Sequence, residues 1–249
     1  MTENKIDEVD ILNFALNLEY LEAEFYTYAV TGKSISSFGV GTKGRADGAN
    51  PTAGGTTVGG NKVTFSDELS HDMVSQISAD ERAHVVLLRG ALGSSAVAMP
   101  KIDLGALGFG FGNQNEFLRA ARILEDIGVT AYSGAAGFLK TPDIISTAAC
   151  LLGAEAEHAA GIRTQIARLK IQTTALDGVD IVPPPSGDAR QVFSIKVSNG
   201  LIATRTVGQV LYLALGGKAG AKQGGFFPTG LNGSIILSTE PATAEKVAA

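Results

Sequence analysis

One arrangement of glutamate, tyrosine and histidine occurs twice along this chain of 249 residues. In each copy a Glu is followed seven positions later by a Tyr, and further on a second Glu is followed three positions later by a His. The first copy consists of Glu19, Tyr26, Glu81 and His84, and the second consists of Glu125, Tyr132, Glu155 and His158. Residues three, four or seven positions apart share one face of a helix. Two such copies therefore predict two helical hairpins whose inner faces carry the same side chains.

The spacing of apolar residues predicts an all-α fold, an antiparallel four-helix bundle. The predicted helices run from residue 7 to about 31, 66 to 92, 113 to 140 and 141 to 169, with a short fifth over 206–215. Asn113 with Glu116 is typical of a capping box, and Thr141 before Pro142 is typical of a helix start. The glutamates of the repeat lie in the middle of the apolar stripes.

Two segments interrupt or follow this bundle. Residues 32–65 have no helical period and are rich in Gly, Ser, Thr and Asn, which predicts a long surface loop with room for a short hairpin. Glu19 and Glu81 are 62 positions apart whereas Glu125 and Glu155 are 30 apart, and this loop accounts for the difference. We expect one bundle over residues 1–171 and a mostly irregular C-terminal extension over 172–249 that packs on it.

An ionised carboxylate in an apolar stripe is costly unless it is paired or binds a cation. If four such glutamates converge with two imidazoles, the negative charges of the four carboxylates repel each other. Two divalent cations would neutralise these charges. The predicted metal ligands are Glu19, Glu81, His84, Glu125, Glu155 and His158. In each copy the first Glu and the His are expected on one metal, and the second Glu of each copy bridges both metals. Oxygen-rich ligation with one His per metal favours two Fe or two Mn ions.

Other residues near the pattern need separate interpretation. Tyr26 and Tyr132 are the candidate catalytic residues beside the metals, where their hydroxyls would orient carboxylates. Glu22 is either an extra ligand or a polar residue at the rim, and its counterpart in the second copy is Gly128. We interpret Cys150, the single cysteine, as a small buried apolar residue.

Two further similarities to the pattern are interpreted as structural. Glu68 and His71 repeat the Glu-x-x-His spacing, but His71 lies thirteen residues before His84, roughly 20 Å along a helix. Arg89 and Arg163 each follow a motif His by five positions, and we interpret both as solvated or paired.

Composition excludes several classes of function. The net charge is −5 with both signs mixed, so no basic stripe predicts a nucleic-acid partner. One cysteine excludes an internal disulfide and a Cys-x-x-Cys metal site. The chain opens MTENKIDEVD without a signal-peptide core and has no apolar run of membrane-spanning length, so we expect a cytoplasmic protein without a membrane partner. The outer faces of the bundle allow a homodimer.

Four segments carry a family resemblance: DILNFALNLEYLEAEFY, LEDIGVTAYSGAA, RTVGQVLYLALGG and GGFFPTGLNG. Through them the chain, from about residue 10 to 235, resembles the desiccation-related family of ferritin-like proteins. The resemblance implies a ferritin-like bundle, with the C-terminal segment as a family extension, and an association with dehydration or oxidative stress. Manganese catalases are similar in their Glu and Glu-x-x-His ligands.

Three functional hypotheses follow. The first is a redox protein in stress protection, with two metals that react with H2O2 or O2 as a peroxidase, ferroxidase or catalase does. The second is a non-catalytic stress-protective or binding protein with a structural metal site. The third is an oxidase of an organic substrate, which requires an apolar, solvent-open cavity beside the metals.

Overall fold

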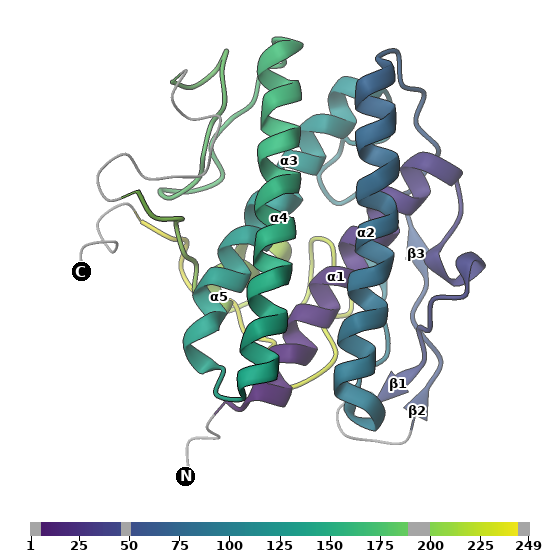
Figure 1. The fold of residues 1–249 in the computed structure, drawn as a ribbon, viewed down its shortest axis with the longest axis vertical. Coiled ribbons are helices and arrows are strands. Elements are labelled where there is room, and N and C mark those ends of the chain that lie inside the picture. Colours follow the sequence, from purple (N-terminus) through teal and green to yellow (C-terminus); the bar gives the residue numbers. More distant parts are fainter. Residues whose placement is uncertain (1–5, 46–50, 189–199, 244–249) are drawn as a thin grey trace.

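The computed structural model describes residues 6–45, 51–188 and 200–243. Four long helices lie side by side, α1 (Glu8–Thr31), α2 (Glu68–Leu92), α3 (Gln114–Ala135) and α4 (Pro142–Arg168) (Figure 1). Helices α1 and α2 run in opposite directions, as do α3 and α4, and these two pairs make the most extensive contacts. Helices α2 and α3 run in the same direction, because Asp67 before α2 donates its backbone N–H to Gln114 at the start of α3. The predicted all-α four-helix bundle is confirmed. Among the described residues, no helix is both long enough and apolar enough to cross a membrane.

The ends of α3 and α4 differ in detail from the prediction. Asn113 Oδ1 accepts from the Glu116 backbone N–H at 3.0 Å, but the Glu116 carboxylate accepts from the Asn113 side chain, so only half of the capping box forms. The turn η3 (Ala136–Phe138) ends α3 earlier than expected. Thr141 does precede α4, yet its hydroxyl donates to Glu8 Oε2 at 2.7 Å instead of capping the helix. This contact fixes the start of α4 on the start of α1.

The long loop after α1 contains the turn η1 (Ile35–Phe38) and three two-residue strands. Strand β1 (Gly44–Arg45) pairs antiparallel with β2 (Pro51–Thr52), as the predicted hairpin requires. Strand β3 (Thr57–Val58) pairs parallel with β4 (Ile102–Asp103), which lies after α2 and the turn η2 (Gly93–Ser95). Two residues are too few for a strand period, so the sequence did not reveal this pairing.

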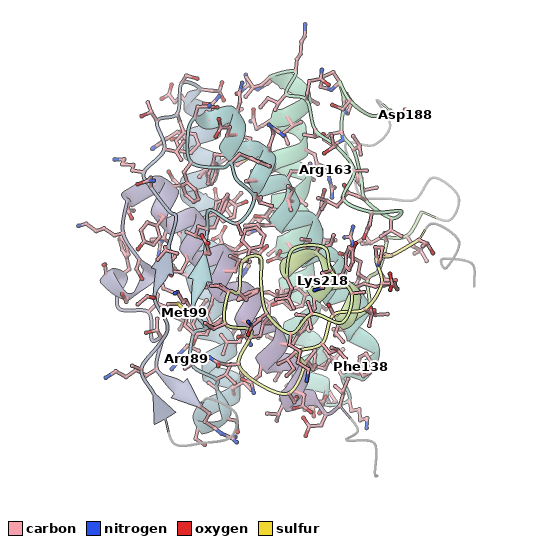
Figure 2. The ribbon with its side chains drawn as sticks, turned by 180° about the vertical axis from the view of Figure 1, so that it is seen from behind. Arg89, Met99, Phe138, Arg163, Asp188 and Lys218 are labelled. Carbon is pink, nitrogen blue, oxygen red and sulfur yellow. The ribbon has the colours of Figure 1, made fainter. Side chains whose placement is uncertain are left out.

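The C-terminal segment covers the side of the bundle formed by α1 and α3. Helix α5 (Val207–Ala214) begins with a complete capping box between Thr206 and Gln209 and packs on α3. Figure 2 shows the yellow segment after it, which carries Lys218, in front of the bundle on the side hidden in Figure 1. Asn17 on α1 donates to the carbonyl oxygen of Asn232 at 2.8 Å. Because this segment covers it, α1 is buried on nearly all sides, and even Asn17 is 0% exposed.

Candidate metal centre

The six predicted ligands meet in the interior of the bundle. The structure places Glu19 on α1, Glu81 and His84 on α2, Glu125 on α3, and Glu155 and His158 on α4. None of the six is more than 8% exposed. The i, i+3 spacing on α2 and on α4 directs each Glu and its His toward the same point, as helical geometry requires. Residues more than a hundred positions apart therefore form one cluster.

His84 faces three carboxylates from three helices. Its Nδ1 atom lies 3.3 Å from Glu19 Oε2, 3.3 Å from Glu81 Oε2 and 3.6 Å from Glu155 Oε1. Donor atoms around one octahedral ion, each about 2.1 Å from it, are about 3 Å apart. These four residues each place a donor atom within 4.8 Å of the others. They form the first candidate position for a cation.

His158 defines a second position next to the first. Its Nδ1 atom lies 3.0 Å from Glu81 Oε1 and 3.6 Å from Glu125 Oε2. The two oxygens of Glu81 thus reach different imidazoles, which is the geometry of a bridging carboxylate. On the outer side of the ring, His158 Nε2 lies 3.4 Å from Asp80 Oδ2. Sequence reasoning missed Asp80 because its counterpart in the second copy is Ala154, so the repeat gives no signal there.

Eight buried polar atoms of this cluster have no hydrogen-bond partner among the described residues. They are Glu19 Oε2, both carboxylate oxygens of Glu81 and of Glu155, Glu125 Oε2, and Nδ1 of His84 and of His158. Buried polar groups in folded proteins are nearly always paired. Although the imidazoles lie close to the carboxylates, these contacts do not have the geometry of hydrogen bonds. Oxygen and imidazole donors aimed at a common point are the ligands of Fe or Mn, and the residues present fit a pair of such ions.

The two tyrosines cross between the halves of the bundle. Tyr26 on α1 donates to Glu125 Oε1 on α3, and Tyr132 on α3 donates to Glu19 Oε1 on α1 at 2.5 Å. Each hydroxyl occupies one carboxylate oxygen and leaves the other free to face the centre. The tyrosines therefore position the carboxylates, and the exchange between halves was not predicted from the repeat.

Burial and mutual repulsion control ionisation in the cluster. Burial, followed by the charge of Glu81, raises the pKa of Glu19 to about 7 and that of Glu155 well above its ordinary value. Burial opposes ionisation of Glu81 as well, but the imidazoles of His158 and His84 lower its pKa to about 2. Protons and cationic imidazoles thus offset the carboxylate charge in the absence of metal. Bound cations would displace these protons.

The remaining residues singled out in the sequence lie as follows. Glu22 is 4% exposed and lies near Glu125 and Glu155, so it is not at a solvent rim. His71 is exposed and lies 3.2 Å from Asp72, away from the centre. Cys150 is exposed, and its interpretation as a buried residue was wrong because its position lies on the outer face of α4.

Arg89 and Arg163 are both paired, but Arg163 was not expected to be buried. Arg89 donates to the Tyr20 hydroxyl and to the Lys43 carbonyl. Arg163 is 1% exposed and donates to Asp126, the residue after Glu125 on α3. It belongs to a second buried cluster of charges, which consists of Arg122, Arg163, Arg205, Asp126, Asp177 and Asp180.

Two of the larger cavities lined by the described residues reach the centre. One of about 600 Å³ lies between α2 and α4 and is lined by both imidazoles and by Asp72, Asp80 and Glu157. The other, of about 240 Å³, is lined mainly by apolar side chains and meets Tyr132. The first connects the centre to an acidic surface. The second is the kind of cavity that the oxidase hypothesis requires.

A four-helix bundle with carboxylates and imidazoles at its centre defines the ferritin-like class of proteins. The sequence pattern of the ferritin-like domain family matches residues 7–168, which is more than half of the chain. The chain therefore belongs to the ferritin-like domain family. It is also 28% identical, over 173 residues, to the desiccation-related protein PCC13-62 of Craterostigma plantagineum. That match covers 63% of this chain and 52% of the relative, so the chain spans about half of the relative's length. The resemblance predicted from the sequence is confirmed.

Proposed function

We propose that this protein is a dinuclear metal-carboxylate protein that consumes peroxide or oxygen in protection against desiccation or oxidative stress. The observation that carries the proposal is the set of eight unpaired polar atoms, which four helices supply around the two candidate cation positions. The link to stress rests on the similarity to a desiccation-related protein. Two Fe or Mn ions held a few ångströms apart would supply two electrons together to H2O2 or O2.

The residues of the chain provide the conditions for this chemistry. Tyr26 and Tyr132 hold Glu125 and Glu19 by one oxygen each, which limits reorganisation around the ions. Burial keeps bulk water from the carboxylates, so their charge acts at low dielectric. The cavity beside the imidazoles admits a small neutral molecule such as peroxide.

Peroxide without an added electron donor is the first substrate to test. In its disproportionation one H2O2 molecule is reduced to water and a second is oxidised to O2, so the reaction needs no external reductant. Protein is produced with both metals supplied and is never exposed to chelator. Metal content and peroxide consumption are then measured. Wild-type protein is expected to hold about two ions per chain.

Glu81→Ala is the decisive variant, because Glu81 reaches both imidazoles. We expect metal content to fall below one ion per chain and peroxide consumption to fall to background, with helicity unchanged. Glu68→Ala is the matched control, since Glu68 is the exposed Glu of the other Glu-x-x-His pair on α2. Unchanged peroxide consumption in Glu81→Ala would reject the proposed site.

The non-catalytic alternative is favoured by the way the ligands join all four helices, since metal there would brace the bundle. Bound metal at a thousandfold excess over its dissociation constant stabilises a fold by about 4 kcal/mol. Chelation should therefore lower the melting temperature under both functions, by about 8–16 °C for a chain of this size. Stoichiometric metal with no reaction toward H2O2 or O2 would select the alternative.

A further inference from the structure

Glu22 adds a fifth carboxylate to the centre. It lies on α1, three residues after Glu19, and is 4% exposed. One of its oxygens lies within 4.8 Å of oxygens from Glu125 and Glu155. Within the part of the chain that the structure describes, Glu125 Oε2 and both oxygens of Glu155 have no hydrogen-bond partner. Glu22 therefore faces carboxylates that are themselves aimed at an ion.

The position that corresponds to Glu22 in the second half is Gly128, and it leaves room for this carboxylate. A Cβ atom on Gly128 would lie 2.3 Å from Glu155 Oε2 and 3.2 Å from Glu22 Oε1. Real Cβ atoms do not approach so closely, so any side chain here would push the carboxylate of Glu155 aside. Glycine inside a helix is less stable than alanine. One half of the repeat thus supplies an additional carboxylate, and the other half has no side chain at the matching place.

When Glu22 is not counted, the two candidate cation positions have different numbers of donor residues. The position of His84 has four residues with donor atoms close together, namely Glu19, Glu81, His84 and Glu155. The position of His158 has three, namely Glu81, Glu125 and His158. Glu22 belongs to neither group but forms a third one with Glu125, a donor of the second position, and Glu155, a donor of the first. Because the second position has one donor fewer and Glu22 lies beside its donor Glu125, Glu22 is placed to supply the fourth donor there.

We propose that Glu22 is a seventh ligand of the centre, that it serves the position beside His158, and that the two metal positions are therefore inequivalent. This inference rests on the proposed function. Four carboxylates with two neutral imidazoles balance two divalent cations. A fifth leaves one negative charge, which is balanced when one of the two cations is trivalent. Glu22 therefore favours the higher oxidation state at one position.

The test is a titration of metal-free full-length protein with Mn²⁺, with free Mn²⁺ followed by its electron paramagnetic resonance signal. Wild-type protein is expected to bind two ions. In Glu22→Gln one ion should bind within threefold of its wild-type affinity and the other at least tenfold more weakly. Glu24→Gln is the matched control: Glu24 is also a buried carboxylate of α1, but it accepts from Ser34 outside the centre. Its two affinities should equal those of wild type.

Combined variants assign the affected position. If Glu22 and His158 serve one ion, then Glu22→Gln with His158→Ala should lose little more than His158→Ala alone. Glu22→Gln with His84→Ala should weaken both ions. Metal-free Glu22→Gln should melt at or above the wild-type temperature, because Gln keeps the shape of the side chain and carries no charge that could repel Glu125 and Glu155, so weak binding cannot result from unfolding. Gly128→Ala is an independent variant and should weaken both ions, because it displaces Glu155.

Three results would contradict the inference, and they are distinguishable. If Glu22→Gln binds both ions within twofold of wild type while Glu19→Gln loses one, the centre exists but Glu22 is not a ligand. If wild-type protein binds no Mn²⁺ and no Fe²⁺, the proposed function fails and the inference fails with it. Wild-type affinities in Gly128→Ala would likewise contradict the role of the glycine.

Discussion

Helix α3 carries two buried clusters of charge that share one turn of backbone. Glu125 faces the candidate metal centre, and the next residue, Asp126, faces Arg122 and Arg163. Both are acidic and almost fully buried, at 0% and 3% exposed. Adjacent positions on a helix point about 100° apart, so the two side chains enter different surroundings. One turn of α3 thus contributes a carboxylate to each of two clusters, and the charge of the two clusters is balanced in different ways.

The clusters differ in how their charge is balanced. Three arginines and three aspartates make up the second cluster, in which Arg205 holds Asp177 by two contacts of 2.8 Å and Arg122 holds Asp180 at 3.0 Å. Its charges cancel within the protein. The centre has five carboxylates, counting Glu22, and two imidazoles, and most of its inward atoms are unpaired. A buried charge cluster without internal partners marks a site for something that the chain does not supply, whereas a balanced one is structural.

The balanced cluster should be the more sensitive to loss of a charge. Asp126→Asn leaves Arg163 and Arg122 without their shared carboxylate in the interior. Breaking a buried ion pair costs about 3–5 kcal/mol. We expect the melting temperature to fall by about 6–20 °C, and by the same amount with metal and after chelation. A fall that appears only in metal-loaded protein would mean that the two clusters are not separate.

Glu125→Gln is the matched change in the centre, and its effect should have the opposite sign in metal-free protein. The amide oxygen can still accept from Tyr26, while the amide N–H groups can donate to neighbouring carboxylates that now have no partner. Satisfying a buried charged group is worth about 1–3 kcal/mol. The metal-free variant should therefore melt higher than wild type, and the rise on adding Mn²⁺ should shrink. Calorimetry with and without metal measures the melting temperature and its rise on adding Mn²⁺. If metal-free Glu125→Gln melts lower than wild type, as we expect of Asp126→Asn, the two clusters do not differ in the way proposed.

The sequence predicted most residues of the metal centre but not the partners within the arginine–aspartate cluster. The six inward ligands were predictable because each occurs twice at helical spacing, and the internal repeat separated them from the decoy pair Glu68 and His71. Glu22 stayed ambiguous because the repeat breaks there, and only the structure places Gly128 against Glu155. No local pattern joins Arg122 to Asp180 or Arg205 to Asp177, since the partners lie on segments without a period.

Burial was the other property that the sequence could not supply fully. Apolar spacing predicted the inner stripe of each helix, but it did not indicate that the C-terminal segment covers the outer side of α1, where Asn17 binds Asn232. The irregular backbone of that segment has no signature beyond its turn residues. The division at residue 171 stays a prediction.

The two tyrosines make hydrogen bonds within the centre, so this part of the centre resembles the arginine–aspartate cluster in being paired inside the protein. Tyr26→Phe and Tyr132→Phe each remove one hydroxyl and no charge, so their effects should be the smallest. Loss of a group that orients a ligand lowers metal affinity by about 10–100-fold. Tyr26 is 0% exposed, and its loss leaves Glu125 Oε1 without a donor. Tyr132 is half-buried and borders the cavity of about 240 Å³, so we expect water from this cavity to replace its lost hydroxyl at Glu19 Oε1.

We therefore expect Tyr26→Phe to weaken one ion by about tenfold or more and Tyr132→Phe to weaken the other by less than tenfold. The Mn²⁺ titration used for Glu22 measures both. Equal losses would mean that water does not replace the Tyr132 hydroxyl. No loss of affinity in either variant would mean that the ions alone position Glu19 and Glu125. The hydrogen bonds from the tyrosines would then not be needed for metal binding. Because each tyrosine serves the glutamate of the opposite half, the weakened ion should be the one beside His158 for Tyr26→Phe and the one beside His84 for Tyr132→Phe.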